Sequence, residues 1–148
     1  MMKKNIYQDL LKLEVNFSQS AVIPYRLSKN GLEILLITSL RKKHWIVPKG
    51  YIEFNLTPFE SAKKEAYEEA GVLGSNETLE VGTFKLNKPI GICVIKVFTM
   101  EVYEVLDEYP EKNDRKRKWF TPEEASEKIA IPEIGEMIKE LNYKLKVA

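Results

Sequence analysis

Residues 50–72, GYIEFNLTPFESAKKEAYEEAGV, decide how the rest of the chain is interpreted. The second half of this stretch places three carboxylates, Glu65, Glu68 and Glu69, at positions i, i+3 and i+4. On a helix these positions share one face. Carboxylates clustered in this way repel one another, and a hard divalent cation such as Mg²⁺, which binds carboxylate and phosphate oxygens, would relieve the repulsion. The pattern therefore indicates a helix that holds a metal ion.

Both ends of this helix are marked in the sequence. Thr57, followed by Pro58 and Glu60, has the form of a capping box with proline at the first helical position. Gly71 follows the last helical residue, where a left-handed C-cap favours glycine. We therefore expect a helix over residues 58–70. At about 100° per residue, one apolar arc of this helix consists of Phe59, Ala62, Ala66 and Ala70.

The stretch resembles the signature of the Nudix hydrolases, a family that cleaves a diphosphate linked to another group. The positions that match in register are Gly50, Glu65, Ala66, Glu68, Glu69, Gly71 and Val72. Two positions depart from the signature, because Leu56 stands where a glutamate is usual and Lys64 where an arginine is usual. In the family these two side chains pair and hold the loop and the catalytic helix. Because both partners of the pair are replaced together, the two changes resemble a coordinated substitution.

The resemblance implies a role for each acidic residue of the helix. Glu65 and Glu69 would bind Mg²⁺, with Mn²⁺ as an alternative ion, and the backbone carbonyl of Lys49 would complete the site. Glu65 and Glu68 would be the catalytic residues, with Glu68 either a further metal ligand or the general base. The alternative is that these glutamates form an ordinary solvent-exposed helix face with no metal. The position of Gly50 in register and the capping box both argue against that alternative.

Two basic stretches are candidates for binding phosphate. Arg41 and Lys43 lie in the loop before Gly50, and Arg115 and Arg117 open the last strand. Arginine and lysine bind phosphate oxygens through charge-assisted hydrogen bonds, and in the diphosphoinositol branch of the family these two regions hold the substrate. For each residue taken singly, a solvated surface charge is an equally good reading. An acidic loop follows residue 103, and the sequence selects none of its carboxylates, Asp107, Glu108, Glu111 and Asp114.

The flanking sequence predicts an α/β (α+β) fold with a mixed sheet and helices on both faces. This layout is the α/β/α sandwich of the Nudix fold, and the resemblance covers roughly residues 20–141. The expected strands are residues 20–27, 32–38, 44–50, 77–86, 90–103 and 115–120, and helices begin at Thr121 and Pro132. The first two strands form a hairpin around the turn at residues 29–31. Residues 1–15 fit either a short helix or a strand.

Composition limits the remaining possibilities. A length of 148 residues suggests one domain, so we expect a single Nudix domain over residues 1–148 with its signature at 50–72. The net charge of +1 offers little general attraction for nucleic acid, so we expect no DNA partner and disfavour RNA. No apolar run approaches the ~18 residues of a membrane span, and no signal peptide is evident, which favours the cytoplasm and no membrane contact. Cys93 lies in an apolar run and is expected to be buried. A homodimer is left open.

These observations favour a Mg²⁺-dependent pyrophosphohydrolase acting on a polyphosphorylated small molecule. Diadenosine polyphosphates and diphosphoinositol polyphosphates are the substrates that the resemblance implies. Leu56 and Lys64 motivate an alternative, a non-catalytic Nudix-fold sensor of nucleotides or phosphorylated ligands. A third hypothesis is removal of pyrophosphate from RNA 5′ ends, which the local basic clusters permit. Metal-dependent turnover separates the first hypothesis from the second.

Overall fold

The computed structural model describes residues 16–76 and 78–147. The first half of the chain contains β1 (Asn16–Ser28), β2 (Gly31–Thr38), β3 (Trp45–Ile46), β4 (Lys49–Tyr51), α2 (Pro58–Glu65) and the π-helical turn η1 (Ala66–Ala70). The second half contains β5 (Val72–Gly74), β6 (Glu80–Lys88), β7 (Gly91–Val105), β8 (Arg117–Phe120), α3 (Pro122–Lys128) and α4 (Pro132–Val147). The open choice of helix or strand for residues 1–15 falls outside the described residues.

The strands form one mixed, eight-stranded sheet. β1 lies in its centre, antiparallel to β2 and β4 and parallel to β7, while β6 and β5 pair with β7. The predicted hairpin is confirmed, with Tyr25 opposite Ile34 and a turn that ends at Gly31. The last strand, β8, pairs with β2 and begins at Arg117, two residues later than expected.

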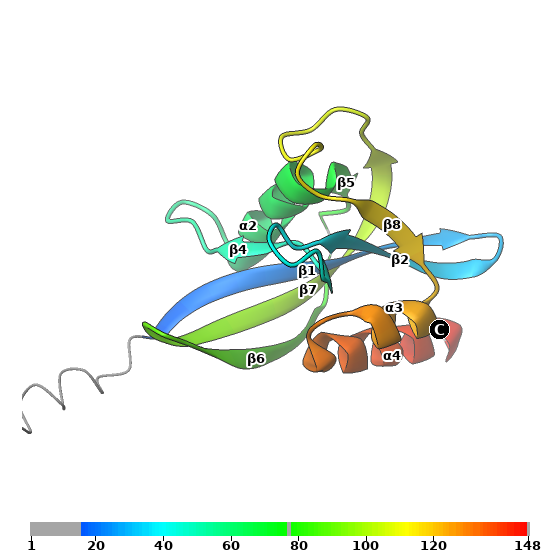
Figure 1. Cartoon of the computed structure of the whole chain (residues 1–148). Coiled ribbons are helices and arrows are strands. Elements are labelled where there is room, and N and C mark those ends of the chain that lie inside the picture. Colours follow the sequence, from blue (N-terminus) through cyan, green and yellow to red (C-terminus); the bar gives the residue numbers. More distant parts are fainter. Residues whose placement is uncertain (1–15, 77, 148) are drawn as a thin grey trace, which may run out of the picture.

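Helices cover both faces of the sheet, as predicted: α2 and η1 lie on one face, and α3 and α4 on the other (Figure 1). The side chains of β2 alternate between the two cores. Ile34 and Leu36 pack in the core under α3 and α4, whereas Leu35 and Ile37 pack in the core under α2 and η1. Cys93 is completely buried in the first of these cores, as expected.

The helix that carries the acidic residues has the ends that the sequence predicts. Thr57 Oγ1 accepts from the N–H of Glu60 at 3.1 Å, and the Glu60 carboxylate accepts from the N–H of Thr57 at 2.9 Å. The last turn, η1, widens to a π-helix, a feature that is frequent at functional sites. Gly71 then adopts the left-handed conformation with φ of 65°. In the described part of the chain, no helix has the length and apolarity needed to cross a membrane.

Candidate active site

The acidic residues of the helix lie against β4 through a close contact at Gly50. A Cβ atom at this glycine would collide with the carboxylate of Glu65. Ala62, Ala66 and Ala70 are completely buried and bring the helix close to the sheet. The glycine of the signature therefore leaves room for the Glu65 carboxylate, and its own backbone has no positive φ.

Glu65 and Glu69 form a carboxyl pair, and their side chains are hydrogen-bonded to each other. The Glu69 Oε1 atom also accepts from the backbone N–H of Lys49 at 3.4 Å. Burial, reinforced by the hydrogen bond that the protonated Glu69 carboxyl donates to Glu65, raises the pKa of Glu69 to about 9. Burial also raises the pKa of Glu65. Two carboxyls in this arrangement favour sharing a proton, which a divalent cation could replace, so the donor set fits a metal ion.

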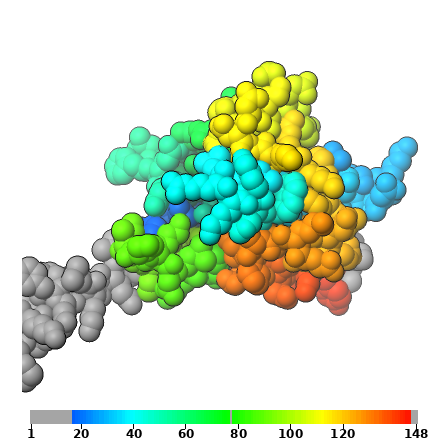
Figure 2. Space-filling model, viewed as in Figure 1, coloured from blue at the N-terminus to red at the C-terminus, as the bar shows by residue number. Residues whose placement is uncertain are grey.

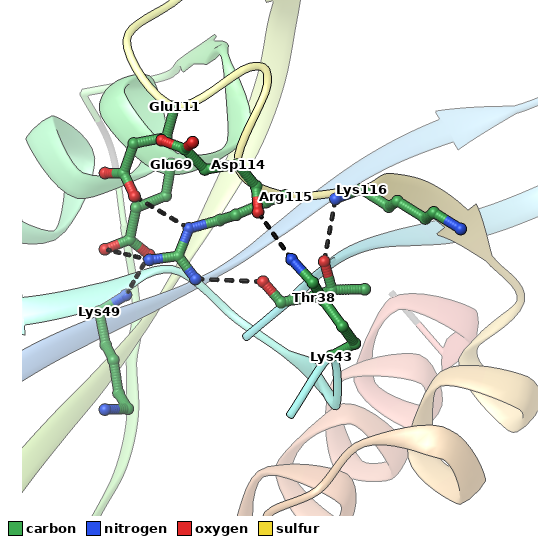
Figure 3. A network of polar contacts seen from close by, with 8 residues as sticks. All are labelled: Thr38, Lys43, Lys49, Glu69, Glu111, Asp114, Arg115 and Lys116. Atoms are coloured by element: carbon green, nitrogen blue, oxygen red, sulfur yellow. Dashed lines mark hydrogen bonds and ion pairs between the residues drawn. The ribbon is translucent and has the colours of Figure 1, made fainter. Parts of the chain in front are cut away.

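Lys49 meets the carboxyl pair with its backbone. Its side chain runs away from Glu69 (Figure 3), and its Nζ atom lies 3.5 Å from Gln19 Oε1. Burial lowers the pKa of the Lys49 ammonium group. This orientation is compatible with the backbone role predicted for Lys49, and that role stays a prediction.

Arg115 connects the carboxyl pair to the end of β2 and to the loop before β8 (Figure 3). Its Nη2 atom lies 3.9 Å from Glu69 Oε2, and its Nε atom donates to Glu111 Oε1 at 3.1 Å. Its Nη1 atom donates to the backbone carbonyl of Thr38 at 3.1 Å. Only 9% of the Arg115 side chain is exposed. A fixed positive charge therefore lies beside the predicted metal ligands.

Glu111 is the loop carboxylate that the structure brings to this site. Its backbone N–H donates to the carbonyl of Glu68 at 2.9 Å, which docks the loop on the helix. Its charge contributes to the raised pKa values of Glu65 and Glu69. The neighbouring Glu108 instead pairs with Lys112 at 2.7 Å. The sequence could not choose between these acids, because the choice depends on how the loop folds back on the helix.

Glu68 lies beside a different cation. Its Oε1 atom is 4.0 Å from the Nζ atom of Lys64, which is itself 2.9 Å from Glu53 Oε1. Across residues 16–76 and 78–147, no three acidic, histidine or cysteine side chains are gathered as a metal-binding group. A metal ion on the carboxyl pair would therefore need a further ligand, for which Glu68, Glu111 and the Lys49 carbonyl are the nearby candidates.

A cavity of about 600 Å³ opens next to Arg115. Its cationic lining consists of Lys43, Lys112, Arg115 and Lys116, and its remaining walls are Thr38, Trp45, Asn113 and Asp114. The two chain segments that carry these residues, coloured cyan and yellow, lie side by side in Figure 2. The structure thus brings together the two basic stretches that the sequence singled out. Lys112 gives no sequence signal of its own, because it lies within an acidic loop.

The other two predicted phosphate ligands lie outside this lining. Arg41 is exposed in the loop between β2 and β3. Arg117 donates to backbone carbonyls at the end of η1 and just after β7: its Nη1 atom donates to Ala70 at 2.9 Å and its Nη2 atom to Leu106 at 2.7 Å. Its guanidinium also stacks on the Tyr109 ring, 4.7 Å from the ring centroid. Arg117 therefore contacts the end of the helix, and its expected role in binding substrate stays a prediction.

The fold and the acidic helix can now be compared with those of known protein families. The family model of the NUDIX domain matches residues 18–141. The chain therefore belongs to the NUDIX domain family, as its signature predicted.

Relatives and solved structures agree with this assignment. The chain is 34% identical over 129 residues to Nudix hydrolase 12, mitochondrial, of Arabidopsis thaliana, a match that covers 73% of this chain and 64% of the relative. It is 38% identical over 96 residues to mouse diphosphoinositol polyphosphate phosphohydrolase 3-alpha, covering 63% and 57%. The chain thus spans less than two thirds of these relatives. An Ap4A hydrolase structure from C. elegans shares the fold, with a TM-score of 0.74 at 19% identity, covering 89% of this chain and 99% of that one.

Proposed function

We propose that the protein is a Mg²⁺-dependent hydrolase that cleaves a phosphoanhydride bond in a polyphosphorylated small molecule. The observation that carries this proposal is the position of Arg115. This one buried cation lies against the carboxyl pair through Glu69 and also lines the basic cavity. A polyphosphate bound in the cavity would therefore extend toward the predicted metal ligands.

The residues of the site suit the chemistry of such a bond. Negative oxygens shield a phosphoanhydride from nucleophiles, and a bound Mg²⁺ supplies charge neutralisation and a more acidic water. Glu65 and Glu69 would hold this ion, with Mn²⁺ as an alternative. Glu68 and Glu111 would be the candidates to accept the proton of the attacking water. Arg115 would offset negative charge on the phosphoryl oxygens.

The cavity favours a compact, densely phosphorylated substrate. Lys43, Lys112 and Lys116 add three cations to that of Arg115, which matches several phosphate groups. Diphosphoinositol polyphosphates are the substrates named in several relatives, and diadenosine tetraphosphate is the substrate named in a structural neighbour. We therefore place both classes first. The same cations keep a 5′-triphosphate RNA as a second candidate substrate, and the cytoplasm as the site of action stays a prediction.

A turnover assay tests this proposal. Phosphate or nucleotide release would be measured with and without Mg²⁺ on diphosphoinositol polyphosphates, diadenosine polyphosphates, nucleotide sugars, nucleoside triphosphates and 5′-triphosphate RNA. We expect metal-dependent cleavage of one class, lowered at least ~100-fold in Glu69→Gln. Glu136→Gln is the matched control, because Glu136 is an exposed carboxylate of α4 paired only with Lys139 in the described structure.

The outcomes separate the hypotheses. Full activity in Glu69→Gln, or a cleavage rate that is unchanged when a chelator removes the metal, would exclude the proposed mechanism. Tight binding of a phosphorylated ligand without turnover would favour the non-catalytic sensor. Selective cleavage of the RNA would replace the small-molecule substrate by an RNA end.

A further inference from the structure

The loop between β4 and α2 is tied to the helix by one residue, Glu53. Its backbone N–H donates to the hydroxyl of Ser61 at 3.0 Å, and Ser61 is 1% exposed. Its carboxylate accepts from Lys64 Nζ at 2.9 Å. Its backbone carbonyl accepts from the N–H of Leu56 at 3.1 Å. Glu53 thus contacts two successive turns of α2 and closes the loop on itself.

These contacts compensate for the unusual residues of the signature. Leu56 has no charge with which to hold Lys64, and Glu53 supplies that charge from three residues earlier in the same loop. Lys64 immediately precedes Glu65, and Glu53 lies three residues after Gly50. The ion pair therefore joins the two chain segments that meet at the contact between Gly50 and the Glu65 carboxylate.

We propose that Glu53 and Lys64 are positioning residues that set the geometry of the carboxyl pair for metal binding. This inference rests on the proposed function, because it assumes that Glu65 and Glu69 hold the ion. The two side chains are 44% and 46% exposed, so the pair adds little to overall stability. Its contribution lies in fixing the β4–α2 loop, and with it the strand that touches both carboxyls.

Replacement of Lys64 distinguishes positioning from simple electrostatics. Removal of a nearby positive charge should by itself strengthen the binding of a divalent cation. If Lys64 holds the loop through Glu53, its removal should instead weaken that binding. Lys64→Met is therefore predicted to lower Mn²⁺ affinity, and Lys64→Arg, which keeps the ion pair, to retain it.

Titration of the full chain with Mn²⁺, followed by electron paramagnetic resonance and calorimetry, measures this directly and requires no substrate. We expect Lys64→Met and Glu53→Gln each to raise the Mn²⁺ dissociation constant by about three- to tenfold, below the ~10–100-fold typical of buried outer-shell partners. Arg26→Met is the matched control. It breaks an ion pair of similar length, Arg26 to Glu33 at 2.9 Å, in the β1–β2 hairpin and should leave Mn²⁺ affinity unchanged.

Each result bears on one of the two proposals. Unchanged or tighter Mn²⁺ binding in Lys64→Met, with the fold intact by circular dichroism, overturns the positioning role and leaves the metal site standing. Weaker binding in Arg26→Met as well would show a non-specific effect and also overturn it. If the wild-type chain binds no Mn²⁺ at millimolar concentration, the proposed metal-dependent function fails, and the positioning role fails with it.

Discussion

The Nη2 atom of Arg115 lies 3.9 Å from the Oε2 atom of Glu69, and both side chains are almost completely buried. The positive charge of Arg115 acts to lower the pKa of Glu69, but burial outweighs it and raises that pKa overall. The same guanidinium is held by Glu111 and by the Thr38 carbonyl, so its position does not depend on Glu69 alone. Arg115 therefore connects the end of β2 and the loop before β8 to the carboxyl pair, and it also lines the cavity.

Replacement of Arg115 is predicted to impair both stability and turnover. Arg115→Met leaves the Thr38 carbonyl and the Glu111 carboxylate without their donor, which should lower the free energy of unfolding by about 1–3 kcal/mol. Arg115→Lys keeps the charge but cannot make the forked contacts, so it should recover only part of the activity. Urea unfolding and steady-state kinetics on both variants check this. Equal activity in the methionine variant and the wild type would contradict a role for Arg115 at the site.

The raised pKa of Glu69 predicts how metal-free stability depends on pH. The folded state holds a proton on this carboxyl up to about pH 9, whereas the unfolded chain releases it near the ordinary value of 4.5. The folded state therefore binds more protons than the unfolded state between these values, and stability should fall as the pH rises from about 5 to 9. Thermal unfolding at a series of pH values, in the presence of a chelator, measures how steeply the stability depends on pH.

Glu69→Gln isolates this contribution, because glutamine cannot titrate. Its melting temperature should depend less on pH than that of the wild type over the same range. Excess Mg²⁺ should also reduce the slope of the wild type, since the cation competes with the proton for the same oxygens. A wild type and a Glu69→Gln variant with parallel pH profiles would show that Glu69 is not the titrating group.

Gly50→Ala is predicted to separate metal binding from folding. The new methyl group would displace the Glu65 carboxylate, so Mn²⁺ affinity should fall by about tenfold or more. Gly31→Ala is the informative comparison, because Gly31 has a φ of 106° in a surface turn and no atom within 4 Å of a Cβ. That variant should lose stability through backbone strain and keep its metal affinity. Calorimetric titration with Mn²⁺ checks both.

The helix and its acids could be predicted because their signals are local. Thr57 and Gly71 mark the ends of the helix through contacts within a few residues, and the spacing of Glu65 and Glu69 fixes their common face. The alternation of β2 between two cores likewise follows from the side-chain period of a strand. These features depend on neighbours in the sequence and need no knowledge of the tertiary structure.

The remainder of the site depends on contacts between distant segments. Glu111 reaches the carboxyl pair only because its loop folds back onto the carbonyl of Glu68. Arg115 and Arg117 are two residues apart in a basic run, yet one lies at the carboxyl pair and the other caps the helix. Composition treats these two arginines alike, and only the path of the loop decides between them. The pairing of Glu53 with Lys64 spans only 11 residues, but it too depends on the path of a loop, the one between β4 and α2.

The different positions of Arg117 and Lys43 lead to opposite predictions for their replacement by methionine. Arg117→Met removes donors from the Ala70 and Leu106 carbonyls, so it should lower the free energy of unfolding by about 1–3 kcal/mol. Lys43→Met removes an exposed cavity cation whose bond to the Asp114 carbonyl, at 3.1 Å, is exposed and can be replaced by water, so it should leave stability nearly unchanged and raise KM by about tenfold. Added salt should narrow the KM difference between wild type and Lys43→Met, because salt screens an exposed charge. Denaturant unfolding and kinetics at two ionic strengths test both variants together. A raised KM with unchanged stability in Arg117→Met would instead support the phosphate-binding role that the sequence predicts for Arg117.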